Sequence, residues 1–370
     1  MQVLLTDIMF PNKYAKWRLV EIKSFIEEYQ SDILVINRIN SYSNITFDFD
    51  WLLLHDDFLL DQYDILIFNP NFNYINQYNT RIDGTIYNGT VHADYLLRHK
   101  SRSSSLFSIN EYDIVYHIFL MCYQVFNSQF TYPHHKQVIH LYPGGGYLNS
   151  SCMSSIHPDV KLIPTQQFIS KHITNHKYIS VYGGPFYYKN ELITIKERTS
   201  TEICICFTSM GNSVEKGADF YHTIVTTYHT NYPNDSIRFI SIGNCPPHPL
   251  ITSYSPMDQL SLSKFYNHHV DILINLDTGV SLNGFPLGIE AIQEGCVLLT
   301  TDVHHQNALN NFNFDPFIII DRNHLSDIID KIKLLTNKTI LSEKSKQLQE
   351  HIYQLFNYDN MMIRIFSFIK

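Results

Sequence analysis

The chain of 370 residues lacks the features that would place it in a membrane, in the secretory pathway or on nucleic acid. Its apolar runs fall short of the roughly 18 residues that a membrane-spanning helix needs. The opening residues have no basic start and Asp7 interrupts their apolar run, so no secretory signal peptide is expected. Lysine and arginine total 27 against 35 acidic residues, a net charge of -8. This balance argues against a broad nucleic-acid surface, which needs clustered cations to neutralise phosphates.

Metal-binding patterns are also missing. The six cysteines are scattered without the paired spacing of a zinc ribbon, so reduced, buried thiols are expected. The Asp-Phe-Asp triplet at residues 48–50 is discounted as a metal site, because chance triplets are common. Adjacent histidines lack the i, i+4 spacing of a helical metal site; they occur at His134/His135, His268/His269 and His304/His305. We expect a cytoplasmic protein, with peripheral contact at the inner face of a membrane left open.

What the chain does have is the composition of a globular protein with two domains. Hydrophobic residues make up 44% and charged residues 17%, which provides apolar material for two cores. A length of 370 residues also exceeds what one core usually supports. Short apolar runs that end in turn formers alternate with amphipathic segments. This pattern is typical of doubly wound α/β layers, in which parallel strands are buried on both faces.

The order of predicted elements divides the chain. Residues 109–126, with His117, are expected to form one buried helix. Strands are expected at residues 1–8, 32–39, 63–70, 136–142, 201–209, 237–243, 270–275 and 296–301. The apolar pattern is lost near residues 187–200, which marks the seam. The predicted domains are residues 1–192 and 193–350, with a terminal helix at 351–370 that packs back on the first domain.

The loop after the strand at residues 201–209 carries groups suited to a diphosphate. Gly211 and small polar residues precede Lys216, Gly217 and a helix. Backbone N–H groups at a helix start and one lysine ammonium complement an anionic phosphate. The terminal Gly-Lys-Ser/Thr of a Walker loop is missing. An ordinary solvated Glu-Lys turn explains the same residues, and both interpretations stay open here.

A second stretch, residues 281–302, places a glutamate on a short helix. Pro286 suits the first helical position and Gly295 the stop, so Glu290 is expected about one turn inside. A half-buried carboxylate needs a partner, and the vicinal hydroxyls of a ribose are donors that it accepts. The alternative is a glutamate on a solvated helical face.

These motifs, in their order, resemble the GT-B glycosyltransferases, closest to family four, the retaining enzymes that use nucleotide sugars. The resemblance runs from Lys136 to Asn357 and includes "EKGAD", "LSLSKFYNHHVDILIN", "NGFPLGIEA" and "GCVLLTTD". It implies two Rossmann-like doubly wound domains facing across a cleft, with an acceptor-binding first domain and a nucleotide-sugar-binding second one. It also implies that neither a metal nor another cofactor is required.

The resemblance implies roles for particular residues. Lys216 matches the cation that neutralises the donor diphosphate, and Glu290 matches the carboxylate that binds the nucleotide ribose. His140, in "KQVIHLY", matches a histidine near the donor sugar, although a lone histidine on an apolar strand is often a satisfied core residue. Lys216, Glu290 and His140 are therefore the predicted catalytic residues. The predicted donor-binding residues are Gly211, Gly243, Asn283, Gly284, Phe285, Pro286 and Leu287.

The sequence also departs from the family. The family's first glutamate falls on Leu282, or on Asn283 with one deletion, and neither is acidic. Its usual arginine corresponds to Gly211, so Lys264 or Arg238 is considered as a replacement cation. The leading hypothesis is a retaining glycosyltransferase that moves a sugar from a nucleoside-diphosphate sugar to a glycan, polysaccharide or glycoprotein. The alternatives are a catalytically silent GT-B partner subunit and a GT-B nucleotide-sugar epimerase.

Overall fold

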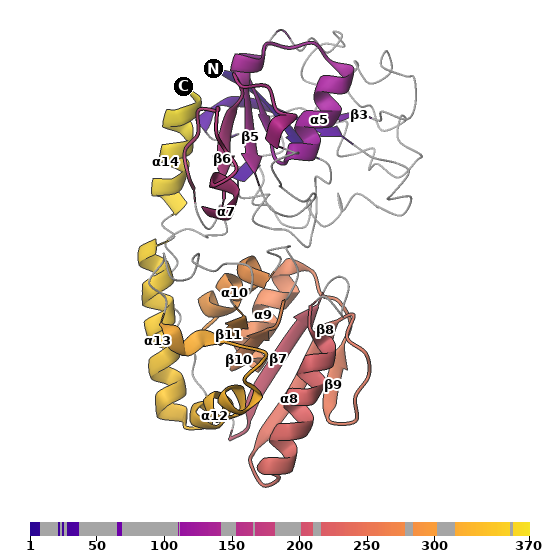
Figure 1. Ribbon diagram of the computed structural model, residues 1–370, viewed down its shortest axis with the longest axis vertical. Helices are drawn as coiled ribbons and strands as arrows, with labels where there is room; N and C mark the ends of the chain where they lie inside the picture. Colours follow the sequence, from indigo (N-terminus) through magenta and orange to yellow (C-terminus); the bar gives the residue numbers. More distant parts are fainter. Residues whose placement is uncertain are drawn as a thin grey trace. The chain divides into compact units, whose positions relative to one another are not determined.

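The computed structural model describes fourteen stretches of the chain, and the structural statements below concern only these. They are residues 1–7, 21–22, 24–25, 28–36, 65–68, 110, 112–141, 153–165, 167–181, 201–209, 216–277, 284–301, 315–355 and 358–370. The chain divides into two compact units (Figure 1). Unit 1 comprises Met1–Pro185 with Asp359–Lys370, and unit 2 comprises Phe186–Tyr358.

Unit 1 is built on a parallel six-stranded sheet of order β3-β2-β1-β4-β5-β6. Its strands are β1 (Gln2–Asp7), β2 (Gln30–Ile36), β3 (Ile65–Phe68), β4 (Ile114–His117), β5 (Gln137–Leu141) and β6 (Lys161–Pro164). Its helices include α5 (Leu120–Gln129), α7 (Gln167–Ser170), α14 (Tyr358–Ile369) and the 3₁₀ turn η2 (His134–Lys136). The side chains of β4 and β5 are buried along the whole length of each strand, as expected for a sheet covered on both faces.

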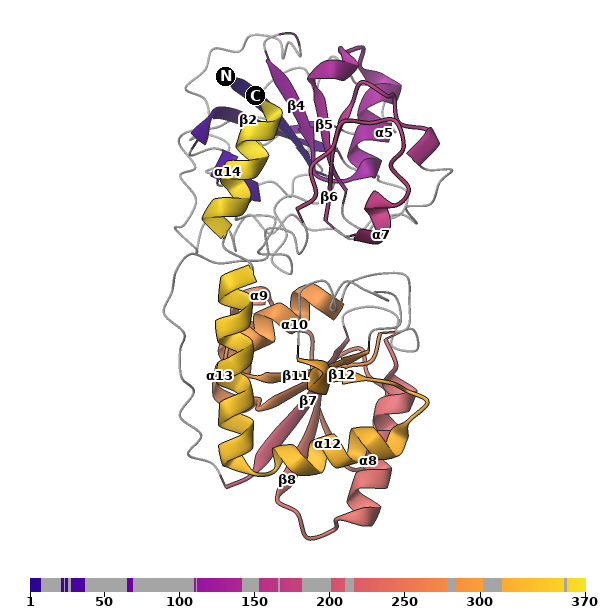
Figure 2. The same cartoon turned by 60° about the vertical axis from the view of Figure 1, so that its left-hand side comes forward.

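Unit 2 repeats this topology. Its parallel sheet has the order β12-β11-β10-β7-β8-β9. Its strands are β7 (Ile203–Ser209), β8 (Ile237–Gly243), β9 (Ile251–Tyr254), β10 (Ile272–Asn275), β11 (Val297–Thr301) and β12 (Ile319–Ile320). Its helices are α8 (Ala218–Asn231), α9 (Gln259–His269), α10 (Gly284–Gln293), η3 (Pro316–Ile318), α12 (Leu325–Leu335) and α13 (Lys338–Leu355). Helix α8 packs against α12, whereas α10 packs against α9 and α13 (Figure 2).

Both sheets have the doubly wound strand order in which the chain starts in the middle and reverses direction. In unit 1 the reversal lies between β1 and β4, and in unit 2 between β7 and β10. The prediction of α/β layers with parallel sheets is confirmed in each unit. Among the described residues, no helix combines the length and the apolar character that crossing a membrane would take.

The prediction of one helix across residues 109–126 is wrong. Ile114–His117 form β4, which pairs with β1, and the helix α5 starts only at Leu120. Phe119 separates the two elements with φ 148°, a conformation that no helix continues through. Residues 114–117 become a strand because they pair with β1, and pairing with a strand distant in sequence outweighs the local helical pattern. The short strand β9 was not predicted either.

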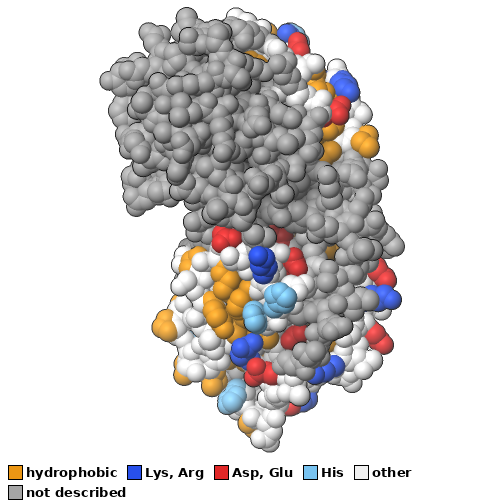
Figure 3. All heavy atoms as spheres, turned by 180° about the vertical axis from the view of Figure 1, so that it is seen from behind, with side chains coloured by type: hydrophobic (Ala, Val, Ile, Leu, Met, Phe, Trp, Pro, Cys, Tyr) orange, Lys and Arg blue, Asp and Glu red, His pale blue; other side chains and the backbone are white. Residues whose placement is uncertain are grey.

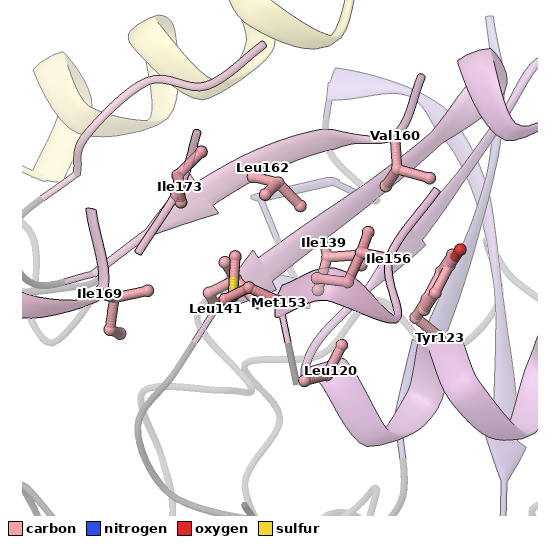
Figure 4. Close-up of a cluster of buried hydrophobic side chains, with 10 residues drawn as sticks. All are labelled: Leu120, Tyr123, Ile139, Leu141, Met153, Ile156, Val160, Leu162, Ile169 and Ile173. Carbon is pink, nitrogen blue, oxygen red and sulfur yellow. The ribbon is translucent and has the colours of Figure 1, made fainter. Parts of the chain in front are cut away.

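The core of unit 1 lies partly between α5 and the strands β5 and β6. Figure 4 shows a cluster of ten buried side chains there. The cluster consists of Leu120, Tyr123, Ile139, Leu141, Met153, Ile156, Val160, Leu162, Ile169 and Ile173. Alternate residues of β5 reach it, so the other face of the strand, including His140, is turned to the opposite helical layer.

That opposite layer contains the C-terminal helix α14. The Phe366 ring packs edge-on against Phe25, with ring centroids 5.2 Å apart. The Lys161 ammonium donates to the main-chain oxygens of Phe368 and Ile369, both at 3.1 Å. A cation at these carbonyls complements the negative end of the helix dipole. Helix α14 is thus an integral part of unit 1, although the chain has passed through unit 2 before reaching it.

His117 lies inside a buried polar network of unit 1. Its Nδ1 lies 2.9 Å from Thr6 Oγ1, and its Nε2 lies 3.0 Å from Gln137 Oε1. Burial lowers the pKa of His117 to about 3, although the hydrogen bond with Gln137 opposes the shift. The folded protein therefore keeps this imidazole neutral at pH values where the unfolded chain protonates it.

We expect His117 to make unfolding pH-dependent. Because its folded pKa is depressed, its contribution is complete above about pH 6.5 and is lost progressively as the pH falls toward 3. The free energy of unfolding should decrease by roughly 2 kcal/mol more between pH 7 and pH 5 in the wild type than in His117→Gln. Urea denaturation at the two pH values measures this difference. The exposed His135→Gln is the control, and an equal pH dependence in all three proteins would contradict the assignment.

Candidate functional site

The carboxyl ends of β7 and β10 form the point where the strand order of unit 2 reverses. The two strands pair in parallel, with Leu273 opposite Cys206. In open parallel sheets ligands bind outside the carboxyl ends of the strands at this reversal point. Lys216 follows β7, immediately before α8, and Asp277 follows β10. The topology therefore brings the predicted cation to the most favourable ligand position of unit 2.

Lys216 and Asp277 form an ion pair at this edge. Lys216 Nζ lies 2.5 Å from Asp277 Oδ2, and the two side chains are only 12% and 8% exposed. The hydroxyl of Thr301, at the end of β11, donates to the main-chain oxygen of Asp277 at 2.8 Å. The pair is thus held by three neighbouring strands, and the interpretation of Lys216 as part of a freely solvated turn is wrong.

The backbone conformation and the surroundings of residue 217 explain why a glycine follows Lys216. Gly217 has φ +85°, in the left-handed region that side chains disfavour. A Cβ on this residue would lie 2.7 Å from both the Cβ and the main-chain oxygen of Leu276. The Lys216–Gly217 turn is therefore pressed against the Leu276–Asp277 segment with room for no side chain. This close approach sets the position of Lys216 relative to Asp277.

The same turn leads directly into α8, which starts at Ala218. The first amides of a helix have no partner within the helix and carry partial positive charge. Lys216 adds a full positive charge at that end, and Asp277 and the exposed Asp219 add negative charges. An anionic ligand here would meet one ammonium, a helix N-terminus and a carboxylate in close proximity.

Glu290 lies on α10, the helix that follows the β10 loop. The helix begins at Gly284, so Pro286 is its third residue rather than its first, and Glu290 lies nearly two turns inside. The side chain of Glu290 is only 6% exposed. The alternative of a glutamate on a solvated helical face is therefore wrong. Gly295 has φ +80° and its amide donates to the Ile292 carbonyl, which agrees with the predicted helix stop.

A buried hydroxyl pair lies near Glu290. Tyr266, on α9, has its hydroxyl 2.9 Å from Thr208 Oγ1, near the end of β7. Burial raises the pKa of Tyr266 well above its usual value, and the negative charge of Glu290 acts in the same direction. The contact between Tyr266 and Thr208 thus joins α9 to the carboxyl end of β7.

His140 lies in the core of unit 1, in a buried triad with Glu21 and Tyr116. Its Nδ1 lies 2.5 Å from Glu21 Oε1 and 2.8 Å from the Tyr116 hydroxyl, which donates to Glu21 Oε1 at 2.6 Å. The side chains of His140 and Glu21 are fully buried. These contacts are those of a core histidine held by a carboxylate. A role of His140 at the donor sugar stays a prediction.

We expect the triad to contribute strongly to stability. His140→Leu should cost about 3 kcal/mol or more of unfolding free energy, because it leaves the buried Glu21 carboxylate without its histidine partner. The double variant Glu21→Gln/His140→Leu should recover part of that loss. Urea denaturation of the two single variants and the double variant measures the coupling. Strictly additive losses would contradict an energetic coupling between Glu21 and His140.

The remaining predicted donor-binding residues divide into three groups. Gly243 ends β8 with φ +94°, and the amide of the next residue, Asn244, donates to the Ser209 carbonyl at 2.8 Å. It therefore lies at the same sheet edge as Lys216. Gly211 and Asn283 lie outside the described residues. Gly284, Phe285, Pro286 and Leu287 form the first turn of α10.

Arg238, considered as a replacement for the family's arginine, lies away from Lys216. Arg238 lies near the start of β8, opposite Cys204, and pairs with Glu202 at 3.4 Å. It is at the amino end of the sheet and so does not replace the missing phosphate cation at the carboxyl edge. On the face of unit 2 seen in Figure 3, basic and acidic side chains are interspersed.

Asp277 is the residue that reasoning from sequence missed. It follows the apolar run of β10 directly, as Lys216 follows the loop after β7. Polar residues after a buried parallel strand at the reversal point are a recognisable signal. The sequence, however, does not show that β10 lies beside β7, and only that adjacency makes the residue notable.

Each unit of the chain carries a doubly wound parallel sheet, which is the architecture expected of the GT-B fold. No protein-family model matches the chain, and no curated protein matches it. Among solved structures it is similar to a mutant of S. aureus TarM in complex with fondaparinux, alpha-GlcNAc-glycerol and UDP, at 10% identity and a TM-score of 0.64, covering 100% of this chain and 99% of that chain.

Two further structures give the same result. A trehalose-6-phosphate structure from E. coli bound with UDP-2-fluoro glucose has 8% identity and a TM-score of 0.64, with 100% and 99% of the two chains covered. A trehalose-6-phosphate synthase, studied for enzymatic glycosyltransfer with retention, has 10% identity and a TM-score of 0.61, with 100% and 99% covered. The predicted GT-B fold is confirmed over the whole chain.

Proposed function

We propose that the protein is a retaining glycosyltransferase that takes a sugar from a nucleoside-diphosphate sugar and transfers it to a glycan, polysaccharide or glycoprotein acceptor. The observation that carries this proposal is the position of Lys216, beside a helix N-terminus at the reversal point of the unit 2 sheet. The structurally similar TarM and E. coli structures contain UDP and UDP-2-fluoro glucose respectively, which supports this class of donor.

The chemistry required of this site is stabilisation of the departing diphosphate. The bond between the anomeric carbon and the diphosphate oxygen breaks, and a bond to the acceptor oxygen forms on the same face of the sugar. The acceptor proton passes to the departing diphosphate, so no protein nucleophile is needed. Lys216 and the first amides of α8 stabilise the developing negative charge. We propose that no metal takes part, and that activity persists in EDTA.

Glu290 is assigned to the ribose of the donor. A buried carboxylate on α10 accepts hydrogen bonds from vicinal hydroxyls, and a site that uses such bonds rejects ligands that lack them. We expect the wild type to bind a nucleoside diphosphate more tightly than its 2′-deoxy form, by about tenfold. In Glu290→Gln this ratio should shrink toward one. Isothermal titration of both ligands measures it, with Glu294→Gln, just beyond the end of the same helix, as the control. An unchanged ratio in Glu290→Gln would remove the ribose assignment.

A two-step experiment tests the function. First, a thermal-shift panel of UDP, GDP, ADP and dTDP identifies the base, because a bound ligand raises the midpoint by mass action. Second, the corresponding nucleotide sugar is incubated with glycan acceptors, and the anomeric configuration of the product is read by NMR. No shift with any nucleotide contradicts donor binding. An inverted product contradicts retention.

A catalytically silent partner subunit is the second candidate. It is favoured by Gly211 in place of the family's arginine and by the absence of an acid at Leu282 and Asn283. A nucleotide-sugar epimerase is compatible with the same losses. Binding without transfer or donor hydrolysis would identify the silent subunit, and conversion of the free nucleotide sugar to its epimer would identify the epimerase.

A further inference from the structure

We propose that Asp277 lowers the affinity of unit 2 for the released nucleoside diphosphate relative to the nucleotide-sugar donor, and so promotes product release. The inference rests on the proposed function and deepens it, because it concerns the ligand preference of the same site. The residue acts through electrostatic repulsion, not through contact with the reacting carbon.

The position of the Asp277 carboxylate is well determined by its surroundings. Its main-chain oxygen accepts from Thr301, and the preceding Leu276 is pressed against Gly217. Its side chain is engaged by Lys216 at 2.5 Å. A ligand that accepts a hydrogen bond from the Lys216 ammonium therefore lies close to the Asp277 carboxylate.

The low exposure of the pair increases the effect. Lys216 and Asp277 are 12% and 8% exposed, so water screens their charges much less than at an open surface. A phosphate oxygen at hydrogen-bond distance from Lys216 Nζ lies within about 5 Å of the Asp277 carboxylate. Without a ligand, the ammonium and the carboxylate balance each other in charge. The site is thus less attractive to anions than a lone lysine would be.

Donor and product differ in charge. In a nucleotide sugar each phosphate has one ester bond and one anhydride bond, so the diphosphate carries about two negative charges at neutral pH. Release of the sugar exposes a terminal phosphate with a second pKa of about 6, which adds nearly one more charge. One unit charge about 5 Å from a poorly screened carboxylate changes an equilibrium constant by about tenfold or more. Asp277 therefore disfavours the product more than the donor.

Such a device has a use in catalysis, because product release limits turnover in many enzymes. A lysine without a counter-ion would hold the more highly charged product more tightly than the donor. The carboxylate offsets this tendency while it keeps the ammonium aligned at the sheet edge. In this pair Lys216 stabilises the departing diphosphate, and Asp277 promotes release of the nucleoside diphosphate product.

The ratio of two dissociation constants tests the proposal. For the full chain, isothermal titration measures Kd of the nucleoside diphosphate selected by the panel and Kd of its glucose ester. We expect Asp277→Asn, which removes the negative charge, to decrease the ratio of product Kd to donor Kd by about tenfold. Asp277→Glu keeps a carboxylate, so its ratio should stay close to the wild-type value. In turnover assays Asp277→Asn should show stronger product inhibition and a lower kcat.

Controls separate charge from structure and from the function itself. Asp235→Asn removes a carboxylate that pairs with Lys333 at 2.6 Å elsewhere in unit 2, and it should leave the ratio unchanged. If Asp277→Asn does not fold, Asp277→Ser serves in its place. A ratio unchanged in the Asp277 variants, with both affinities altered equally, overturns the proposal and leaves the proposed function intact. A wild type that binds no nucleoside diphosphate overturns both.

Discussion

Replacement of Lys216 by methionine is expected to lower kcat/KM for glycosyl transfer by about 100- to 1,000-fold, which is the usual effect of removing one preorganised group that stabilises developing negative charge. Methionine keeps much of the side-chain length and removes the ammonium. The loss should fall mainly on kcat, because the charge on the departing diphosphate is largest in the transition state. Steady-state kinetics with the donor and acceptor found for the wild type measure both constants.

Two controls make the Lys216 result interpretable. Lys346→Met removes an exposed lysine that forms an i, i+4 pair with Glu350, and it should leave kcat/KM unchanged. Lys216→Met also leaves Asp277 buried without its lysine partner, which by itself destabilises the sheet edge. The double variant Lys216→Met/Asp277→Asn removes this buried negative charge as well, so it should recover stability but stay inactive. Wild-type kcat/KM in Lys216→Met would show that the ammonium takes no part in transfer.

Substitution of Gly217 by alanine is expected to lower the free energy of unfolding by about 2–4 kcal/mol and to abolish nucleotide binding. The positive φ of +85° costs a side-chain residue about 1 kcal/mol. The new Cβ would also lie 2.7 Å from Leu276 Cβ and from the Leu276 main-chain oxygen, so the backbone must shift. That shift would displace Lys216 and the start of α8 from the sheet edge, where the diphosphate is proposed to bind. Urea denaturation measures the stability, and thermal shift with the selected nucleotide measures the binding.

Gly295→Ala is the matched control for this prediction. Its φ of +80° carries nearly the same conformational penalty, at the end of α10 rather than at the start of α8. It should lose about 1 kcal/mol and retain nucleotide binding. Equal losses at the two glycines would mean that the contact with Leu276 is accommodated without cost.

Much of the fold could be predicted because the strands are buried on both faces. Such strands appear as short apolar runs, and "ICICFTS" of β7 is an example in which every residue is buried. Lys216 and Glu290 could be selected because their local motifs resemble a known family. Gly295 could be recognised as a helix stop from its type and place alone.

Other features depended on contacts that no local pattern contains. Residues 114–117 become a strand only because β1 lies beside them. Asp277 becomes part of the site only because β10 pairs with β7. His140 resembled a site residue in sequence, and its contacts with Glu21 and Tyr116 come from two other elements.

The sequence by itself determined the class of architecture and the identity of the proposed phosphate-binding lysine, because hydrophobic periodicity and short motifs are properties of neighbouring residues. Only the tertiary structure decided which strands meet at the reversal point, that Glu290 is buried and that Lys216 is paired with Asp277. These features follow from strand order and helix packing, which bring together residues far apart in the chain. The net charge of a binding site depends on which side chains are brought together in this way.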